Sequence, residues 1–310
     1  MNIAILGATS HIAKNLIMGF RGPGQLSLFA RSIERVLSFL KQENLGEYIG
    51  EVKELDYFEA EHSKYDAIIN CIGFGTPDKI RTQGAEIFFV TERYDNMAIK
   101  YLESHHSTVY INFSSGALHG VDIFAPVDES SEFRISLGSL SVKDAYRITK
   151  LNSETKHRSM SDYSIIDLRI FSFFSRYIAL GSSYLASEIV RALQANNEFV
   201  TNDTEIVRDY VHPKDLCSLV DICKGAIGLN KSFDVYSRKA AGKSEIIAAF
   251  QQQFGLRVRI DNEISGGSPT GNKNYYASIN RDAEKMLGYF PRYTSIEALM
   301  DETSALISGA

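Results

Sequence analysis

Several features that mark other protein classes are missing from this chain of 310 residues. It has no apolar run near the ~20 residues that a membrane helix needs, and it starts with a strand-like segment in place of a charged and apolar leader. No basic stripe stands out against the net charge of −5, which argues against nucleic acid or an anionic membrane as the main partner. We therefore expect a cytoplasmic protein with a small-molecule substrate.

Metal ligands and disulfide patterns are also lacking. The three cysteines, Cys71, Cys217 and Cys223, are an odd number without metal-ligand spacing, so we expect reduced thiols in the core. His105 and His106 adjoin but have no acidic or thiol ligands nearby, and no metal site is expected. The hydrophobic content of 44% and charged content of 23% are those of an ordinary globular protein. The length suits one large domain or two joined ones.

Apolar runs alternate with amphipathic stretches through the first half of the chain. This order predicts an α/β fold with a doubly wound parallel sheet covered by helices on both faces. Strands are expected near residues 2–6, 25–30, 52–55, 67–71, 109–113 and 164–170, and helices near 11–20, 32–42, 79–104 and 142–160.

The pattern becomes less regular after Arg169. Helices are expected near residues 183–195, 213–226 and 243–254, with a strand near 205–211. The Ser/Gly/Asn-rich segment 261–274 is predicted to be an exposed or mobile loop.

Tyr146 and Lys150 in YRITK form the most informative pair. Residues four apart share one face of a helix, so the Lys150 ammonium can favour the phenolate of Tyr146 and make it a proton donor and acceptor. Ser141 and Asp144 form a capping-box-like start for this helix. A second pair at this spacing, Tyr210 and Lys214, encloses a proline, which places Tyr210 before a helix and excludes it as the catalytic pair.

A phosphate-binding loop is predicted between the first strand and the first helix. In GATSHIA, Gly7 supplies the tight turn, and the backbone amides that follow can hold a pyrophosphate at the helix N-terminus, from Thr9, Ser10, His11 and Ile12. Only Gly7 remains of the full glycine pattern. Ser10 would crowd a phosphate unless its hydroxyl bonds it, and the His11 ring could reach a phosphate oxygen or face solvent.

The end of the second predicted strand indicates which dinucleotide binds. Arg31 and Ser32 stand where an NAD site has an acid, and an arginine attracts the extra phosphate of NADP. NADP is therefore expected over NAD. Asp56 and Tyr57, after the third predicted strand, are candidate adenine contacts.

Together these segments resemble the extended short-chain dehydrogenase/reductases, the NAD(P)-dependent nucleotide-sugar epimerases, dehydratases and reductases. The resemblance covers nearly the whole chain and is carried by GATSHIA, NCIG, FSSGALHG, YRITK and RDYVHPKDL. It implies a Rossmann domain, here residues 1–170, and a smaller substrate-binding region, residues 171–310, partly interleaved with the sheet. It also implies a nucleotide-sugar substrate and a homodimer formed through two long helices of each subunit.

The resemblance assigns roles residue by residue. The catalytic set falls on Ser115, Tyr146 and Lys150, with Ser114 as the adjacent alternative to Ser115. The segment that passes under the cofactor includes Cys71, Ile72 and Gly73. Arg208 falls on the arginine that contacts the nucleotide diphosphate; alternatively it could pair with Asp209 or Asp215 as a structural bridge. Ser172 replaces the family's Asn among the substrate contacts.

One departure narrows the reaction. The 4,6-dehydratases follow their threonine with Asp-Glu, whereas Gly116 and Ala117 follow Ser115 here, so dehydration is not expected. We expect an NADPH-dependent reductase of a keto group on a nucleotide-linked sugar, with Tyr146 as proton donor. The alternatives are an epimerase that retains its cofactor and a non-catalytic dinucleotide sensor.

Overall fold

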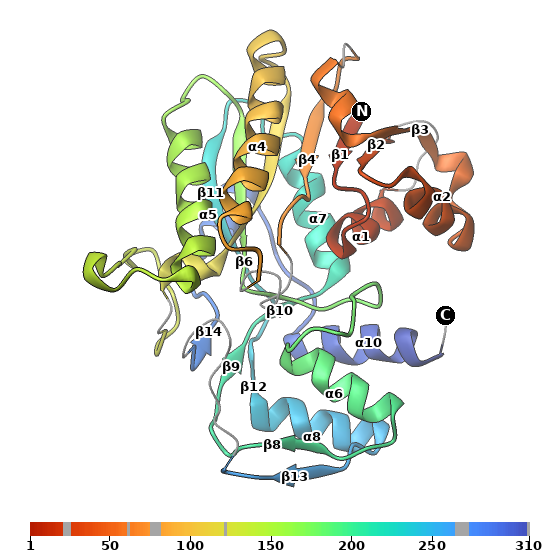
Figure 1. Ribbon diagram of the computed structural model, residues 1–310, viewed down its shortest axis with the longest axis vertical. Helices are drawn as coiled ribbons and strands as arrows, with labels where there is room; N and C mark the ends of the chain where they lie inside the picture. The colour runs from red at the N-terminus through yellow and green to blue at the C-terminus, as the bar shows by residue number, and fades with distance from the viewer. Residues whose placement is uncertain (21–25, 61–62, 75–81, 121–122, 264–272, 309–310) are drawn as a thin grey trace.

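The computed structural model describes residues 1–20, 26–60, 63–74, 82–120, 123–263 and 273–308. Within them, seven parallel strands form one sheet in the order β11-β6-β5-β4-β1-β2-β3 (Figure 1). The predicted α/β, doubly wound Rossmann sheet is confirmed. Because the strands are parallel, their carboxyl ends lie along one edge, and ligands bind at that edge in open sheets of this kind.

The elements of the sheet and its covering helices follow the alternation in the sequence. The strands are β1 (Ile3–Leu6), β2 (Leu26–Ala30), β3 (Ile49–Glu54), β4 (Ala67–Asn70), β5 (Val109–Ser115), β6 (Ile165–Ile170) and β11 (Asn230–Val235). The helices are α1 (His11–Gly19), α2 (Ile33–Gln42), α4 (Glu86–Ser104), α5 (Val142–Arg158) and α7 (Pro213–Cys223).

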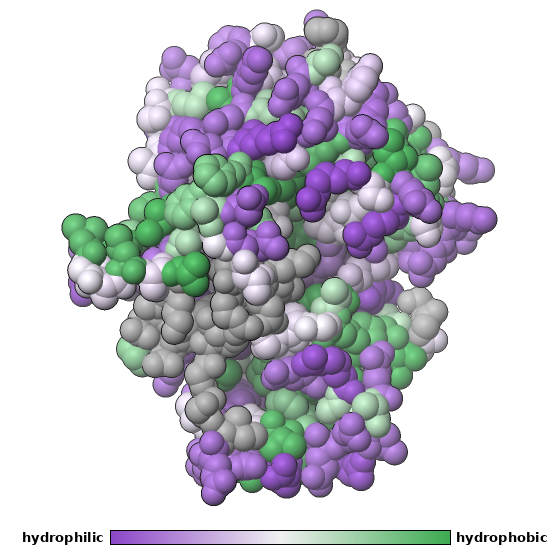
Figure 2. Space-filling view, viewed as in Figure 1, coloured by the Kyte–Doolittle hydropathy of each residue, from purple (hydrophilic) through white to green (hydrophobic). Residues whose placement is uncertain are grey.

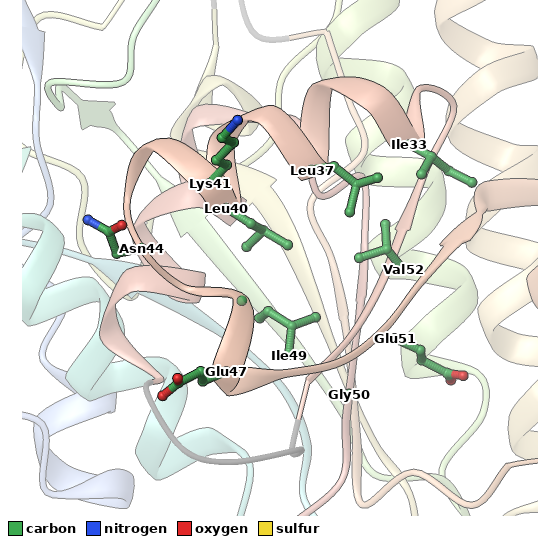
Figure 3. Close-up of a pocket in the computed structure, with 11 residues that line it drawn as sticks. Ile33, Leu37, Leu40, Lys41, Asn44, Glu47, Ile49, Gly50, Glu51 and Val52 are labelled. Carbon is green, nitrogen blue, oxygen red and sulfur yellow. The ribbon is translucent and has the colours of Figure 1, made fainter.

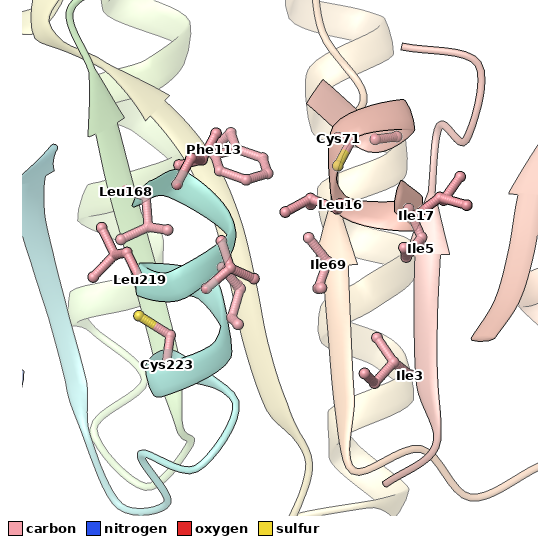
Figure 4. Close-up of a cluster of buried hydrophobic side chains, with 14 of the residues drawn as sticks. Ile3, Ile5, Leu16, Ile17, Ile69, Cys71, Phe113, Leu168, Leu219 and Cys223 are labelled. Carbon is pink, nitrogen blue, oxygen red and sulfur yellow. The ribbon is translucent and has the colours of Figure 1, made fainter. Parts of the chain in front are cut away.

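Both faces of the sheet are buried against helices. On one face, Ile3 and Ile5 of β1 belong to one apolar cluster with Leu16 of α1, and the same cluster includes Leu168 of β6 beside Leu219 of α7 (Figure 4). Ala4 and Leu6 of the same strand pack with α4 residues on the other face. Each face is apolar because side chains alternate along a strand and the sheet has helices on both sides, which gives the continuous apolar strands seen in the sequence.

The C-terminal region has its own core beyond the carboxyl edge of the sheet (Figure 1). This region contains α6 (Leu185–Gln194), α8 (Lys243–Phe254) and α10 (Ser295–Ser308), with short strands β7 (Ser172–Phe173), β8 (Phe199–Thr201), β9 (Val207–Arg208), β10 (Tyr210–Val211), β12 (Ala241–Gly242), β13 (Val258–Ile260) and β14 (Tyr275–Tyr276). The helix α9 (Asp282–Leu287) packs instead against β11 of the large sheet. No helix in the described ranges is long and apolar enough to cross a membrane.

Two sequence predictions need correction, and one strand was missed. The strand β11 was not predicted, although it pairs with β6 and closes one end of the sheet. The helix predicted over residues 79–104 is interrupted at Gly84, which has a φ of 52°, so α4 begins at Glu86; residues 79–81 lie outside the described ranges. The loop predicted over 261–274 is exposed at Asn262, Glu263 and Asn274, but the prediction is wrong at Lys273, which is 8% exposed; residues 264–272 are not described.

Candidate active site

The loop after β1 brings the chain close to the end of β4. Gly7 has a φ of 78°, and a Cβ at this position would lie 2.8 Å from Cγ1 of Ile72. Only glycine fits both the left-handed backbone and this contact. The tight turn predicted at Gly7 is therefore present, and it directs the chain into the N-terminus of α1.

The N-terminus of α1 has free amide groups where a pyrophosphate would bind. The backbone N–H groups of Thr9, His11 and Ile12 form no hydrogen bond within the described residues. The Ser10 hydroxyl accepts from the Ala13 N–H at 3.1 Å and caps the helix, and its own O–H can still donate to a phosphate oxygen, so the predicted phosphate contact stays a prediction. Orphaned amides at the positive end of a helix fit an anionic dinucleotide phosphate.

The ring of His11 does not face solvent, which was one of the two positions considered from the sequence. Its buried Nδ1 has no hydrogen-bond partner within the described residues, so contact with a phosphate oxygen stays a prediction. Its ring packs against Phe173 of β7, with 5.2 Å between the ring centroids. Burial lowers the pKa of His11 to about 4, and the nearby Lys14 charge adds to this effect. The imidazole is therefore neutral at physiological pH and joins the loop to the C-terminal region instead of supplying a positive charge for a phosphate.

Arg31, Ser32, Asp56 and Tyr57 lie where β2 and β3 end. Arg31 is exposed and forms no ion pair within the described residues, whereas the Ser32 hydroxyl accepts from the Arg35 N–H and caps α2. Asp56 pairs with Arg93 of α4 at 3.2 Å, and Tyr57 is 59% exposed. Arg31 is thus the free cation among the predicted adenosine contacts that the structure describes.

The segment after β4 lies beside the phosphate loop. Asn70 accepts from the Ile72 N–H at 3.0 Å and donates to the Tyr110 hydroxyl at 2.9 Å, which fixes the chain as it leaves the strand. Cys71 is buried, and Gly73 follows at the carboxyl edge. The three cysteines are free, as predicted.

Tyr146 and Lys150 occupy one face of α5. The predicted capping box of Ser141 and Asp144 is present and starts the helix. Lys150 is buried and donates to the carbonyl of Phe113 at 2.6 Å, while its Nζ lies 6.0 Å from the centroid of the Tyr146 ring. The Tyr146 side chain is half-buried, and its hydroxyl forms no hydrogen bond with a described residue. This phenol can therefore bond to a substrate.

The second Tyr/Lys pair is confirmed as structural. Tyr210 is buried in β10, and Pro213 is the first residue of α7. Between them, Nδ1 of His212 accepts from the Lys214 N–H and caps the helix.

Of the two serines that end β5, Ser115 faces the site. The Ser114 hydroxyl donates to the Glu154 carboxylate of α5. The Ser115 hydroxyl instead lies 3.3 Å from the hydroxyl of Tyr276 in β14. Burial raises the pKa of the Tyr276 phenol, and the nearby Tyr146 contributes to this shift. A second phenol, absent from the sequence predictions, therefore joins Ser115 and Tyr146.

The residue after Ser115 could not be an acid. A Cβ at Gly116 would lie 2.4 Å from the Phe171 ring, which also contacts the rings of Tyr276 and His119. Ser172 follows Phe171 and pairs with Tyr210 in the β7–β10 ladder. The Phe171 ring thus occupies the space that an acidic side chain at residue 116 would need.

Arg208 lacks the carboxylate partners that were considered for it. Its Nη1 donates to the carbonyls of Val207 and Lys273, at 2.8 and 2.7 Å. The Asp209 carboxylate accepts from the Ser237 N–H, and the Asp215 carboxylate accepts from two backbone N–H groups of the segment before α10. The structural-bridge interpretation is therefore wrong, and the remaining donors of the guanidinium fork can bind an anion.

A paired set of buried charges lies between the sheet and the helices α4 and α5. The buried His157 ring contacts Asp95 at 2.9 Å and Asp167 at 2.9 Å. Lys156 pairs with Asp95 at 2.6 Å, and Arg158 pairs with Asp167 at 2.9 Å. Burial alone would lower the pKa of His157, but bonds and charges from Asp167 and Asp95 raise it to about 9.

Two surface features lie away from these residues. A hollow of about 770 Å³ runs along the sheet edge between α2 and β3 and has mainly aliphatic lining (Figure 3). This hollow lies four strands away from β5, whereas Ser115 and Tyr146 lie at the end of β5 and on α5. It is therefore not the candidate active site. Figure 2 shows an apolar protrusion at the left, where the exposed Leu137 and Leu140 precede α5.

Comparisons place the fold among known proteins. A model of the NAD dependent epimerase/dehydratase family matches residues 3–226. The UDP-glucuronic acid 4-epimerase of Bacillus cereus, solved with UDP-glucuronic acid and NAD, superposes with a TM-score of 0.81 at 13% identity, covering 100% of both chains. The UDP-glucose 4-epimerase of Stenotrophomonas maltophila, solved with NAD and formylated UDP-arabinopyranose, gives 0.82 at 17%, again with 100% of both.

A dehydratase has the same fold. The dTDP-glucose 4,6-dehydratase of Bacillus anthracis, solved with NAD, gives a TM-score of 0.76 at 13% identity and covers 100% of this chain and 97% of its own. No curated protein matches the sequence.

Proposed function

This chain belongs to the NAD dependent epimerase/dehydratase family, and from that premise we propose that it transfers a hydride between a nicotinamide cofactor and a carbon of a nucleotide-linked sugar. The observation that carries the proposal is the free hydroxyl of Tyr146 on the same helix face as the buried Lys150, beside Ser115 and Tyr276. A proton-transfer phenol is what interconversion of a hydroxyl and a keto group requires.

Each residue has a separate part in this step. Tyr146 gives a proton to the carbonyl oxygen in reduction and takes it back in oxidation. Ser115 donates a hydrogen bond to that oxygen. Lys150, anchored on the Phe113 carbonyl, keeps further donors for ribose hydroxyls and places a positive charge beside the phenol.

The residues of the dinucleotide site fit the cofactor. Orphaned amides at the start of α1 and the close approach at Gly7 suit a pyrophosphate, and the bound nicotinamide would accept or supply the hydride. We propose NADP as the preferred form because Arg31 is an exposed cation at the end of β2. The solved relatives above hold NAD, so the preference is tested directly by comparing the affinities of NADPH and NADH for wild type and Arg31→Asp.

Two reactions share the proposed step. An epimerase oxidises and re-reduces the same carbon, and the family name and two of the solved relatives support this reaction. A reductase consumes the reduced cofactor, and Arg31 supports it, because NADPH is the usual donor of biosynthetic reduction. The Phe171 ring against Gly116 argues against dehydration.

One experiment separates these reactions. The purified protein is analysed for retained nicotinamide and then incubated with NADPH or NADH and 4-keto or 4-hydroxy sugars linked to UDP or dTDP. Net loss of the reduced-nicotinamide signal indicates a reductase, and interconversion of sugar isomers without net loss indicates an epimerase. Tyr146→Phe should lower the rate of either reaction by about 10²–10⁴-fold and leave the affinity for the cofactor unchanged. Cofactor binding without turnover of any sugar by wild type would establish the sensor alternative.

We also propose a homodimer through α4 and α5, which lie side by side (Figure 1). Phe89 on α4 is 67% exposed and is the apolar residue that such a contact would bury. Phe89→Glu should convert the dimer to a monomer in light-scattering measurements. Within the proposed function, residues 171–310 bind the nucleotide sugar and residues 1–170 bind the dinucleotide.

A further inference from the structure

Lys273 is a buried cation that enters the candidate active site from the C-terminal region. Its side chain is 8% exposed, and its backbone bridges Ile123. The Nζ atom lies 4.7 Å from the centroid of the Tyr276 ring, whose hydroxyl contacts Ser115. The ammonium therefore lies against the aromatic wall of the site at the sugar-reacting end.

Among the described residues, no counter-charge accompanies this ammonium. Lys273 forms no hydrogen bond through Nζ and no ion pair with any residue in the described ranges. Its charged neighbours are Arg208, whose guanidinium bonds the Lys273 carbonyl, and Arg147, which is already paired with Asp144 at 2.7 Å. A buried ammonium without a carboxylate is costly for the fold, because burial penalises an unpaired charge.

The position of Lys273 separates it from the candidate diphosphate contact. Arg208 has a planar fork with free donors, which suits a diphosphate. Lys273 instead presents a single point charge over Tyr276, next to the hydroxyls that would hold the reacting sugar oxygen. Two adjacent cations without acidic partners can thus take two different anionic groups of one ligand.

We propose that Lys273 binds a carboxylate on the sugar ring, so that this enzyme prefers a nucleotide-linked uronic acid over the matching neutral hexose. This specificity rests on the proposed function. The carboxylate would pair with the Lys273 ammonium while the diphosphate occupies Arg208. Burial, together with the charges of Arg208 and Arg147, lowers the pKa of Lys273 to about 8, so most of the ammonium is charged at neutral pH and binding of an anion would keep it so.

The test compares a matched pair of substrates on the full-length, cofactor-loaded protein. Dissociation constants are measured by calorimetry for UDP-glucuronic acid, UDP-glucose and UDP, and for the dTDP forms, with wild type, Lys273→Met and Lys273→Arg. Methionine keeps an apolar chain of similar length without the charge, and arginine keeps the charge. Wild type should bind the uronic acid about tenfold or more tightly than the hexose, as expected for a charge-assisted hydrogen bond.

The variants distinguish the possible sources of negative charge. Lys273→Met should remove the preference and leave the hexose and the free nucleotide unaffected, while Lys273→Arg should restore part of it. An equal loss for all three ligands in Lys273→Met would mean that Lys273 contacts the diphosphate, which overturns the carboxylate assignment and leaves the proposed function intact. Absence of binding of any nucleotide sugar to wild type would overturn both proposals.

Discussion

Two groups of buried charges near the sheet differ in how they are balanced. Beneath α4 and α5, the imidazolium of His157 lies between Asp95 and Asp167, and each carboxylate has a second cation at 2.6–2.9 Å. At the carboxyl edge, Arg208 and Lys273 have carbonyl and aromatic neighbours and no carboxylate among the described residues.

The contrast separates charges that serve the fold from charges that serve a ligand. A buried ion pair is costly to break from one side, since the remaining partner stays desolvated. A buried cation without a partner lowers the stability of the folded protein. An anion that binds to this cation offsets the loss and stabilises the folded state. Mutations in the first group should therefore lower the free energy of unfolding, whereas mutations in the second group should mainly change the affinity for the ligand.

The largest effect is expected from removing the centre of the paired group. His157→Leu should lower the free energy of unfolding by about 3–5 kcal/mol, because Asp95 and Asp167 would then lie close together with less compensation. Urea denaturation followed by circular dichroism measures this change. His106→Leu is the matched control, since His106 is exposed, and it should stay within about 0.5 kcal/mol of wild type. Equal losses in both variants would show that the paired group contributes no special stability.

Alkaline pH should weaken the same group without mutation. The pKa of His157 is raised from 6.5 in the unfolded chain to about 9, so its contribution is complete below pH 6.5 and is lost as the pH rises through 9. His157 and Lys156 lower the pKa of Asp95 to about 2 despite its burial, so Asp95 stays ionised throughout this range. The loss should be on the order of 3 kcal/mol between pH 6.5 and 9.

Denaturation curves across this pH range test the prediction, with His157→Leu as the reference. The fall in stability should be absent from the variant. A fall of the same size in both proteins would assign the titration to another group.

The local patterns of the sequence explain why much of the fold could be predicted. The alternation of strand and helix located β1 to β6, because each strand is a short apolar run between amphipathic helices. β11 escaped prediction because Asn230, Lys231 and Ser232 at its start are polar, and its place depends on pairing with β6, about sixty residues earlier. That pairing leaves no local signal.

The residues of the candidate site likewise fall into those with a local sequence signal and those placed by long-range contacts. Tyr146 and Lys150 are four residues apart on one helix, so their geometry could be predicted from spacing alone. Tyr276 reaches Ser115 across 161 residues of sequence, and Lys273 lies in a segment whose composition indicates a loop. Their burial follows from the bridges of Ile123 with Lys273 and of Val127 with Ser278, which are long-range contacts. The unpaired state of Arg208 could not be predicted either, because acidic residues adjoin it in sequence.

At the carboxyl edge, Arg208→Met should weaken binding of UDP by roughly 30-fold, equivalent to about 2 kcal/mol, through loss of charge-assisted hydrogen bonds. Stability should change little, since Arg208 gives up only two bonds to carbonyls. Calorimetry of UDP binding measures the first effect and denaturation the second. Unchanged affinity together with a large loss of stability would place Arg208 with the structural charges and would remove the contrast between the two groups.

The smallest effect is expected to have the opposite sign. Lys273→Met should raise the free energy of unfolding at pH 7 by about 1 kcal/mol, because the folded protein holds a cation whose pKa is lowered to about 8, and only part of that cost is offset by its contact with the Tyr276 ring. A basic group whose pKa is lower in the folded protein than in the unfolded chain destabilises the fold in its protonated form, and this cost is complete below the folded pKa.

The gain should therefore shrink as the pH rises from 8 toward 10.5, where both states lose the proton. Denaturation of wild type and Lys273→Met at pH 7 and pH 9.5 measures the difference, with UDP-glucuronic acid absent. A variant less stable than wild type at pH 7 would mean that Lys273 supports the fold, as His157 does, and that it is not a charge reserved for a ligand.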